Sequence, residues 1–288
     1  MVDIVKAKAP EALLAALHSD DPQVRWRAMA GLAKVRIPQV AKALGEALHD
    51  PEPFVRWSAA QALGEVARHG SDRAVPVTVG RVLRQAARDG DPGVRASAAD
   101  GIAAWGPGAP LEPVLNLARD DQPGVRAAAM RALGLAGSRA AHVVGPALLL
   151  GLEDADAEVR RMAAGAIAWC RDGAGPSALV LRLSDPAGTV RAAALRALSR
   201  VSAGEHEAVV LPLLQDADPA VRAEAVRFLS LWGTQLALAP LAALEQDAAP
   251  LGESTIGTLA ADARRHIARR LHRWRGWFWR LWERWQRR

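Results

Sequence analysis

The sequence predicts an all-α solenoid of about seven to eight helix pairs, followed by a C-terminal amphipathic helix. Three observations predict this fold class. A phrase of aspartate, often proline, and then Val-Arg returns seven times along the 288 residues. The composition is half apolar, rich in alanine and without tyrosine, which is typical of closely packed helices. Residues 264–288 combine arginine and tryptophan at helical spacing.

The Val-Arg phrase recurs with a period of about one helix pair. Successive valines are separated by 31, 39, 31, 34, 31 and 31 residues, and they are Val24, Val55, Val94, Val125, Val159, Val190 and Val221. Such a period indicates an array in which each unit contacts only its neighbours. Because an array of this kind builds an extended surface, the period favours binding over catalysis.

Each phrase is predicted to begin a helix. Four aspartates are expected as N-caps, and three of them precede a proline at the first helical position: Asp21, Asp91, Asp156 and Asp218. The valine, the residue four later and the residue eight later fall on one buried face. The +4 residues are all alanine: Ala28, Ala59, Ala98, Ala129, Ala163, Ala194 and Ala225. Small side chains there let neighbouring helices approach closely, so larger ones would overpack the stack.

The other helix of each pair is expected in the segments between the phrases. Examples are Gln39–His49, Val79–Arg88, Ala141–Leu152 and His206–Leu214. The longest interval contains extra residues, His69–Val77, with Gly70, Ser71 and Pro76, which predict a longer loop. Val-Arg is replaced by Gly252-Glu253 where an eighth phrase is due, so residues 234–263 are interpreted as a cap.

The phrase Asp-x-Asp-Pro-x-Val-Arg-x-x-Ala-x-x-Ala-Leu-Gly resembles the HEAT repeat, in the short bacterial variety similar to phycobilisome bilin lyases. The resemblance covers roughly residues 11–250. It implies a right-handed α-α superhelix and a ladder of bonds between adjacent units. The ladder would join the arginine of each phrase to the aspartates Asp50, Asp89, Asp120, Asp154, Asp185 and Asp216, while Ser19 breaks the pattern in the first unit.

Residues typical of catalysis or metal binding are sparse, so we expect no enzyme activity and no cofactor. Only one His-Glu pair occurs, His206-Glu207, which cannot complete a metal shell. The single cysteine, Cys170, is expected to be buried and inert. The N-terminus has no sustained apolar stretch of the signal-peptide kind, which predicts a cytoplasmic protein. The resemblance nevertheless leaves a lyase-like activity on a tetrapyrrole as an alternative.

Two sets of residues beside the phrases are candidates for binding a protein partner. Trp26 and Trp57 both stand two residues after the valine in successive units, where they are expected to anchor a partner chain or to pack on neighbouring helices. Six residues after the valine, later units carry Arg131, Arg196 and Arg227, which would make a basic surface or a merely solvated face.

Residues 264–288 form the predicted tail, which is separate from the solenoid at 1–263. The tail carries a net charge of +9, which leaves −3 for the rest of the chain. As a helix it places an apolar face, which includes Ile267 and Leu271, opposite arginines. The residues proposed to dock are Trp274, Trp277, Phe278, Trp279, Leu281, Trp282 and Trp285, with Arg273, Arg280 and Arg284.

Three interpretations of the tail are open: a cap on the last repeat, an interfacial helix on a membrane or membrane-bound partner, and a nucleic-acid-binding segment. Nucleic acid is disfavoured because no basic stripe continues along the repeats. The sequence therefore predicts a non-catalytic scaffold or assembly factor within a larger complex, held by its tail at the cytoplasmic face of a membrane. A bilin-lyase-like factor is the first alternative, and a nucleic-acid-binding protein is the second.

Overall fold

The computed structural model describes residues 10–35, 38–69, 74–106, 108–136, 140–170, 175–201 and 204–286. For residues 38, 69, 74–76, 136 and 273–286 it describes the backbone alone. The chain falls into two compact units, residues 1–170 and residues 171–288.

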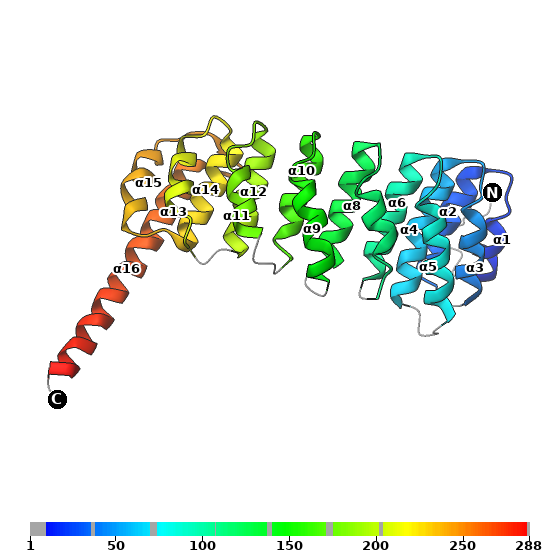
Figure 1. The fold of residues 1–288 in the computed structure, drawn as a ribbon, viewed down its shortest axis with the longest axis horizontal. Helices are drawn as coiled ribbons and strands as arrows, with labels where there is room; N and C mark the ends of the chain where they lie inside the picture. The colour runs from blue at the N-terminus through cyan, green and yellow to red at the C-terminus, as the bar shows by residue number, and fades with distance from the viewer. Residues whose placement is uncertain are drawn as a thin grey trace. The chain divides into compact units, whose positions relative to one another are not determined.

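The first unit consists of helices that alternate between two layers (Figure 1). One layer contains the helices that begin with the Val-Arg phrases, and the other contains their partners. The helices are α1 (Pro10–Ala16), α2 (Pro22–Leu32), α3 (Pro38–Ala47), α4 (Pro53–His69), α5 (Ala74–Ala86), α6 (Pro92–Trp105), α7 (Glu112–Leu117), α8 (Pro123–Ala136), α9 (Ala141–Gly151) and α10 (Ala157–Ile167). Each Val-Arg helix packs on the next one, so that α2, α4, α6, α8 and α10 form a continuous layer.

The second unit repeats this arrangement and ends in a long helix (Figure 1). Its elements are α11 (Gly175–Arg182), α12 (Gly188–Val201), α13 (Glu207–Val210), the 3-10 helix η3 (Leu211–Gln215), α14 (Pro219–Trp232), the 3-10 helix η4 (Gln235–Ala237), α15 (Leu238–Leu244), strands β1 (Pro250–Leu251) and β2 (Ser254–Thr255), and α16 (Ile256–Gln286). The structure is thus an all-α repeat fold, as the sequence predicts.

The buried face predicted for the phrases is confirmed. All seven +4 alanines are fully buried, and the +8 residues are at most 3% exposed. The valines are equally buried except Val24, which is half-buried. The predicted N-caps are confirmed too, because Asp21, Asp91, Asp156 and Asp218 each accept a hydrogen bond from a backbone N–H in the first turn. Cys170 is buried, as expected.

Glycines bring α4 and α6 closer together than the alanines alone would allow. A Cβ atom on Gly64 would collide with the backbone of Gly101, and a Cβ atom on Gly101 would collide with the carbonyl of Ala60. The two backbones therefore touch where these residues cross, and even alanine is too large there.

Two of the expected partner helices differ from the prediction. Helix α5 begins at Ala74, within the segment predicted as a loop, because Pro76 falls in the first turn, where its missing N–H has no bond to make. The segment His206–Leu214 forms the short α13 and then the 3-10 helix η3, since Pro212 cannot donate an α-helical hydrogen bond.

The predicted cap contains a hairpin followed by α16. Strands β1 and β2 pair antiparallel, and Gly252-Glu253 forms the turn, in which Gly252 has a φ of +62° that suits glycine. Helix α16 then packs on α14 and α15. Its buried apolar side chains are those of Ile256, Ala260, Ala263 and Ile267. Ile267, expected on the docking face of the tail, is a core residue instead, and α16 crosses residues 263 and 264 without a break.

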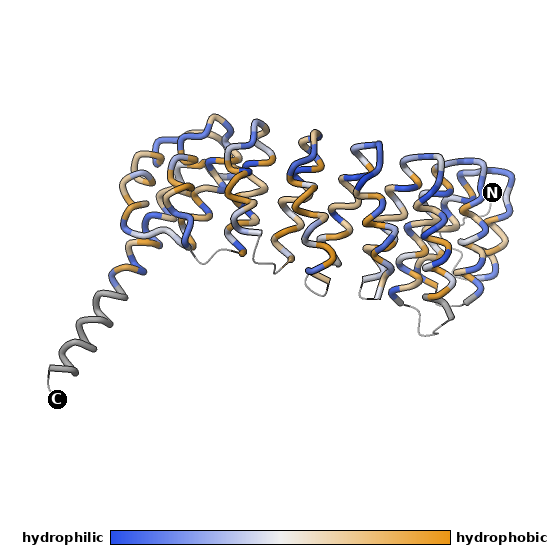
Figure 2. Tube along the Cα trace, viewed as in Figure 1, coloured by the Kyte–Doolittle hydropathy of each residue, from blue (hydrophilic) through white to orange (hydrophobic). Residues whose placement is uncertain are grey.

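The helices of the described residues are amphipathic and of ordinary hydropathy. Figure 2 shows apolar and polar residues interleaved along them, with hydrophilic turns between the helices of a pair. None of these helices has both the length and the apolar character needed to cross a bilayer.

A matched pair of glycine substitutions tests the close approach of α4 and α6. Gly64→Ala is expected to lower the unfolding free energy by about 1–3 kcal/mol, because its Cβ atom overlaps the backbone of Gly101. Gly165→Ala, in the helix α10, meets no atom within 4 Å and should be neutral or stabilise by about 0.5–1 kcal/mol. Urea unfolding followed by circular dichroism measures both, and equal effects would contradict the close contact.

Candidate functional site

In six of the seven Val-Arg phrases the arginine binds the aspartate of the following repeat. In five of the six described pairs the guanidinium Nε and Nη2 both donate to the carboxylate at about 3 Å or less, as in Arg95 with Asp120 at 2.7 and 2.8 Å, and in Arg222–Asp247 Nε donates at 2.7 Å. In the first unit the pairs are Arg25–Asp50, Arg56–Asp89, Arg95–Asp120 and Arg126–Asp154, and in the second unit Arg191–Asp216 and Arg222–Asp247. The ladder that the resemblance implied is confirmed for the first five of these pairs.

The remaining guanidinium nitrogen ties each arginine to the turn before its own helix. Arg95 Nη1 donates to the carbonyls of Asp89 and Gly90, at 2.9 and 3.2 Å. The carboxylate of Asp120 in turn accepts the backbone N–H of Gln122. One side chain therefore holds two successive turns together, and all three of its guanidinium nitrogens donate hydrogen bonds within the protein.

The pKa values of five ladder aspartates are lowered by these contacts. Hydrogen bonds from arginine hold the pKa values of Asp120, Asp154 and Asp247 below their usual range. At Asp50 and Asp216 burial acts most strongly and raises the pKa, but the arginine, the backbone N–H groups and the nearby charges together outweigh it and leave the pKa lowered. The carboxylates are therefore charged in the folded protein.

The last pair, Arg222–Asp247, was not anticipated from the sequence. Arg222 Nε donates to Asp247 Oδ2 at 2.7 Å, and Asp247 also accepts the N–H of Ala249. The spacing contained the signal, because Asp247 stands five residues before Gly252, where the eighth valine is due. The ladder thus continues into the cap although the Val-Arg phrase itself is lost.

Trp26 and Trp57 are both partly exposed, at 43% and 40%. The ring of Trp57 lies over the start of α6, where a Cβ atom on Gly93 would be 2.7 Å from its Cε2 atom. Its Nε1–H donates to Asp91 at 2.9 Å, and this bond holds the pKa of Asp91 below its usual value. Trp57 therefore joins two successive repeats and still presents part of its ring to solvent. Binding of a partner by either tryptophan stays a prediction.

The three predicted arginines outside the ladder are all paired with acids. Arg131 binds Asp100 of the preceding Val-Arg helix at 2.6 Å. Arg196 and Arg227 both bind Glu224, which is 7% exposed, at 2.7 and 2.9 Å. These contacts neutralise much of the basic surface expected there, and partner binding by these residues stays a prediction.

The docking residues proposed in the tail lie outside the described side chains. They are Trp274, Trp277, Phe278, Trp279, Leu281, Trp282, Trp285, Arg273, Arg280 and Arg284, for which the structure describes only a helical backbone. The part of α16 before them is anchored in the second unit. Arg264 binds Glu245 at 2.6 Å, and Arg270 donates to the carbonyls of Ser230, Leu231 and Gly233 at the end of α14.

An apolar stripe that the sequence analysis did not identify lies on α9 in the first unit. Val143 is 39% exposed, Leu150 is 59% exposed, and Pro146 lies exposed between them. The signal was present as the spacing of three apolar residues on the face opposite the buried Val144 and Leu148. The stripe borders an open groove of about 530 Å³ that also contains Leu115 and Asn116 of α7.

Glu207 of the His206-Glu207 pair has a structural role. Glu207 is 7% exposed and accepts the backbone N–H of Thr234 at 2.7 Å. Across the described ranges, no group of three or more His, Cys, Asp or Glu residues is arranged to hold a metal ion.

Comparisons with known proteins agree with this architecture. The family model described as HEAT repeats matches residues 10–79, 80–164 and 176–256. The crystal structure of the Escherichia coli protein YibA is similar, with a TM-score of 0.65 and 20% identity over 91% of this chain and 95% of YibA. An engineered protein has a TM-score of 0.51 and 25% identity over 92% of this chain and 80% of its own. No curated protein matches the sequence.

Removal of the last ladder carboxylate is expected to destabilise the second unit. Asp247→Asn should lower the unfolding free energy by about 1–3 kcal/mol, because Arg222 loses a charged hydrogen-bond partner in a largely shielded place. Asp262→Asn is the control, since its pair with Arg265 is exposed and should change stability by about 0.5 kcal/mol or less. Urea unfolding measures both, and equal losses of unfolding free energy would show that the Arg222–Asp247 pair stabilises no more than the exposed pair.

The lowered aspartate pKa values predict that acid destabilises the protein. Unfolded aspartates take up protons near pH 3.9, roughly, before the folded ladder aspartates do. The unfolding free energy should therefore be retained above about pH 5 and fall steadily as the pH drops below about 4. Thermal melts between pH 6 and pH 3 measure this, and a melting temperature that rises between pH 5 and pH 3 would contradict it.

Proposed function

The chain belongs to the HEAT-repeat family, and we propose that it is a non-catalytic scaffold or assembly factor attached by its C-terminal helix to a membrane surface or a membrane-bound partner. HEAT repeats by themselves indicate a protein-interaction scaffold. The proposal includes the attachment, a cytoplasmic location at the membrane face and membership of a larger complex.

The observation that carries the scaffold role is that the repeated side chains bond within the protein, whereas some of the variable apolar side chains face solvent. The described ladder arginines bond within the protein, whereas apolar groups such as those of Val143 and Leu150 on α9 face solvent. Exposed apolar residues beside a groove are typical of protein-binding surfaces. The partly exposed rings of Trp26 and Trp57 offer a second anchoring surface in the same unit.

The attachment is supported by the two parts of α16. The residues that close the last repeat end with Ile267 and Arg270, yet the helix continues to Gln286. Capping therefore needs only the first half of the helix. The second half contains five tryptophans and one phenylalanine, which would contribute about 15 kcal/mol at most if each buried roughly 100 Å² in a membrane interface. Arginines on the other face would add attraction to anionic lipid.

Truncation after His272 tests the attachment. Deletion of residues 273–288 keeps Ile267 and Arg270, so the melting temperature should be unchanged, while binding to vesicles of phosphatidylcholine and phosphatidylglycerol should be lost. Vesicle flotation and thermal melts measure the two effects. Unchanged flotation would overturn the attachment, and a collapsed melt would show that the deleted residues belong to the cap.

Substitutions within the full chain separate lipid from nucleic acid as the target of the tail. Replacement of Trp274, Trp277, Trp282 and Trp285 by alanine should abolish flotation, including at high salt. Replacement of Arg273, Arg280 and Arg284 by glutamine should weaken it mainly at low salt. Binding that falls by about one log unit per log unit of salt for each contact, and that prefers RNA over vesicles, would favour the nucleic-acid alternative.

The tetrapyrrole alternative has its own test. The partly exposed rings of Trp26 and Trp57 present aromatic faces on which a flat ligand can stack. If the protein handles a bilin, it should show a visible absorption band when purified from its own cells. A colourless protein that binds no added bilin would contradict this alternative.

A further inference from the structure

We propose that three arginines at the C-terminal end of α5 form a docking site for an acidic peptide segment of a protein partner. The residues are Arg81, Arg84 and Arg88. The proposal rests on the scaffold function above, and it adds where one partner binds and which chemistry it presents.

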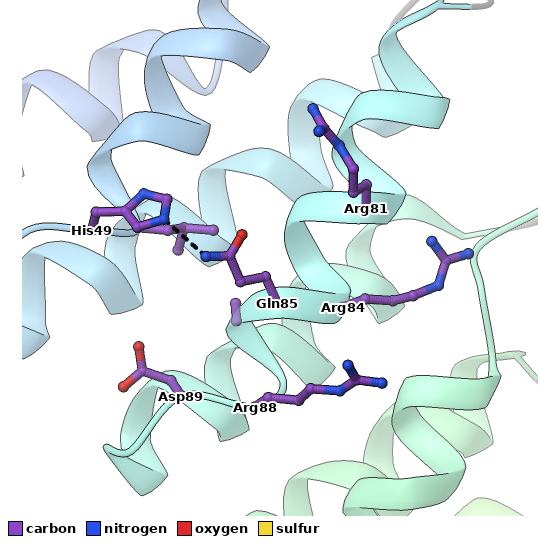
Figure 3. A pocket seen from close by; sticks show the side chains of 8 residues that line it. His49, Arg81, Arg84, Gln85, Arg88 and Asp89 are labelled. Carbon is purple, nitrogen blue, oxygen red and sulfur yellow. Dashed lines mark hydrogen bonds between the residues drawn. The ribbon is translucent and has the colours of Figure 1, made fainter.

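The three arginines occupy the exposed side of α5. Val79, Val82 and Leu83 bury the opposite side of the helix, whereas Arg81 and Arg84 face solvent, and Arg88 follows in the turn after α5. A spacing of three and then four residues keeps such side chains on one stripe about 10 Å long. Figure 3 shows Arg84 and Arg88 extending in the same direction from the end of the helix.

The positive charge of this stripe is not neutralised nearby. The segment 74–88 contains no acidic residue, and the next residue, Asp89, is already held by two bonds of 2.9 Å from Arg56. Arg84 Nε lies 3.9 Å from Glu112, but both side chains are about half exposed, so that pair is weak. Within the part of the chain that the structure describes, neither Arg81 nor Arg88 forms an ion pair.

This distinguishes the α5 stripe from the other arginines expected to bind a partner. Arg131 is paired with Asp100, and Arg196 and Arg227 share Glu224. A new anion would have to compete with these carboxylates. At Arg81 and Arg88 it would meet guanidinium groups that carry five donors each and bind no acid of the described chain.

The arginines border an open groove of about 530 Å³ with both apolar and polar walls. Leu48 and Ala86 supply apolar surface, and His49 and Gln85 are joined by a hydrogen bond of 2.8 Å across one side (Figure 3). The groove can therefore accept the aliphatic part of a side chain while the guanidinium groups bind its carboxylate.

The dimensions favour a short acidic peptide over a nucleic acid. Glutamates at positions i, i+4 and i+7 of a partner helix span about 10 Å, the same length as the arginine stripe. A nucleic acid would need a basic track that continues over neighbouring units. Residues 1–263 instead have a net charge of −3, so the basic surface at α5 is local.

Fluorescence anisotropy with the full-length protein tests the site. The probe is a fluorescein-labelled alanine-based helical peptide with glutamates at i, i+4 and i+7, and its counterpart has glutamine at the same positions. We expect the triple variant Arg81→Gln, Arg84→Gln and Arg88→Gln to bind the acidic probe about tenfold more weakly than the wild type. The glutamine peptide should bind both proteins equally weakly.

A charge-matched variant controls for the general loss of positive charge. Arg27→Gln, Lys34→Gln and Arg68→Gln removes three exposed cations of the same compact unit that do not line this groove. It should change the affinity less than about twofold, because a distant exposed charge is screened by salt. Circular dichroism verifies that both triple variants stay folded. Equal weakening by the two variants, or no binding of the acidic probe to the wild type, would overturn the docking site.

Two further measurements separate this site from other outcomes. A single-stranded RNA probe that binds more tightly than the peptide, and through the same three arginines, would overturn the assignment to an acidic peptide. Affinity purification then tests the scaffold function itself. If the triple variant and the wild type retain the same partners equally, the docking-site proposal fails and the scaffold function stands. If the peptide binds through the three arginines but no partner co-purifies, the site stands and the scaffold proposal falls.

Discussion

Hydrogen bonds between an arginine of one repeat and an aspartate of the next set the geometry of successive repeats within each of the two compact units. In five of the six described pairs the guanidinium donates from two nitrogens to the carboxylate of the next repeat and from the third to carbonyls of the preceding turn, as Arg95 does between Asp120 and Asp89. A planar group with fixed donor directions leaves little freedom in the distance or angle between successive turns. The alanines and glycines of the Val-Arg helices, such as Ala98 and Gly64, then allow those helices to meet at that imposed spacing.

This arrangement separates structure from function within each repeat. The residues that recur are buried or bonded internally, so they are poorly placed to recognise anything. Specificity must come from positions that vary between units, and in the first unit these differ in character from helix to helix. Helix α5 presents Arg81, which binds no acid of the described residues, and Arg84, whose exposed pair with Glu112 is weak, whereas α9 presents the apolar groups of Val143 and Leu150. A scaffold with such different surfaces can hold partners of different chemistry.

In the C-terminal part of the second unit, the hairpin and α16 follow the last Val-Arg repeat. The Arg222–Asp247 pair keeps the spacing of the ladder, while the Gly252 turn redirects the chain into α16. Ile267 and Arg270 complete the contacts that a following unit would have made with α14. The described contacts that close the stack end at Arg270, and the proposed attachment concerns the part of α16 beyond it.

The sequence by itself determined the repeat period, the helix starts at Asp91 and its equivalents, the buried face and most of the ladder, because these depend on residues near one another or on a regular spacing. It could not determine which cations remain available. Arg131 and Arg81 look alike in the sequence, but only the tertiary structure brings an acid 31 residues away onto Arg131 and none of the described acids onto Arg81. The contact of Trp57 with the following repeat and the pairing of Asp247 with Arg222 are also decided by the tertiary structure. Pairing across units depends on how two surfaces meet in space, and no local pattern records that.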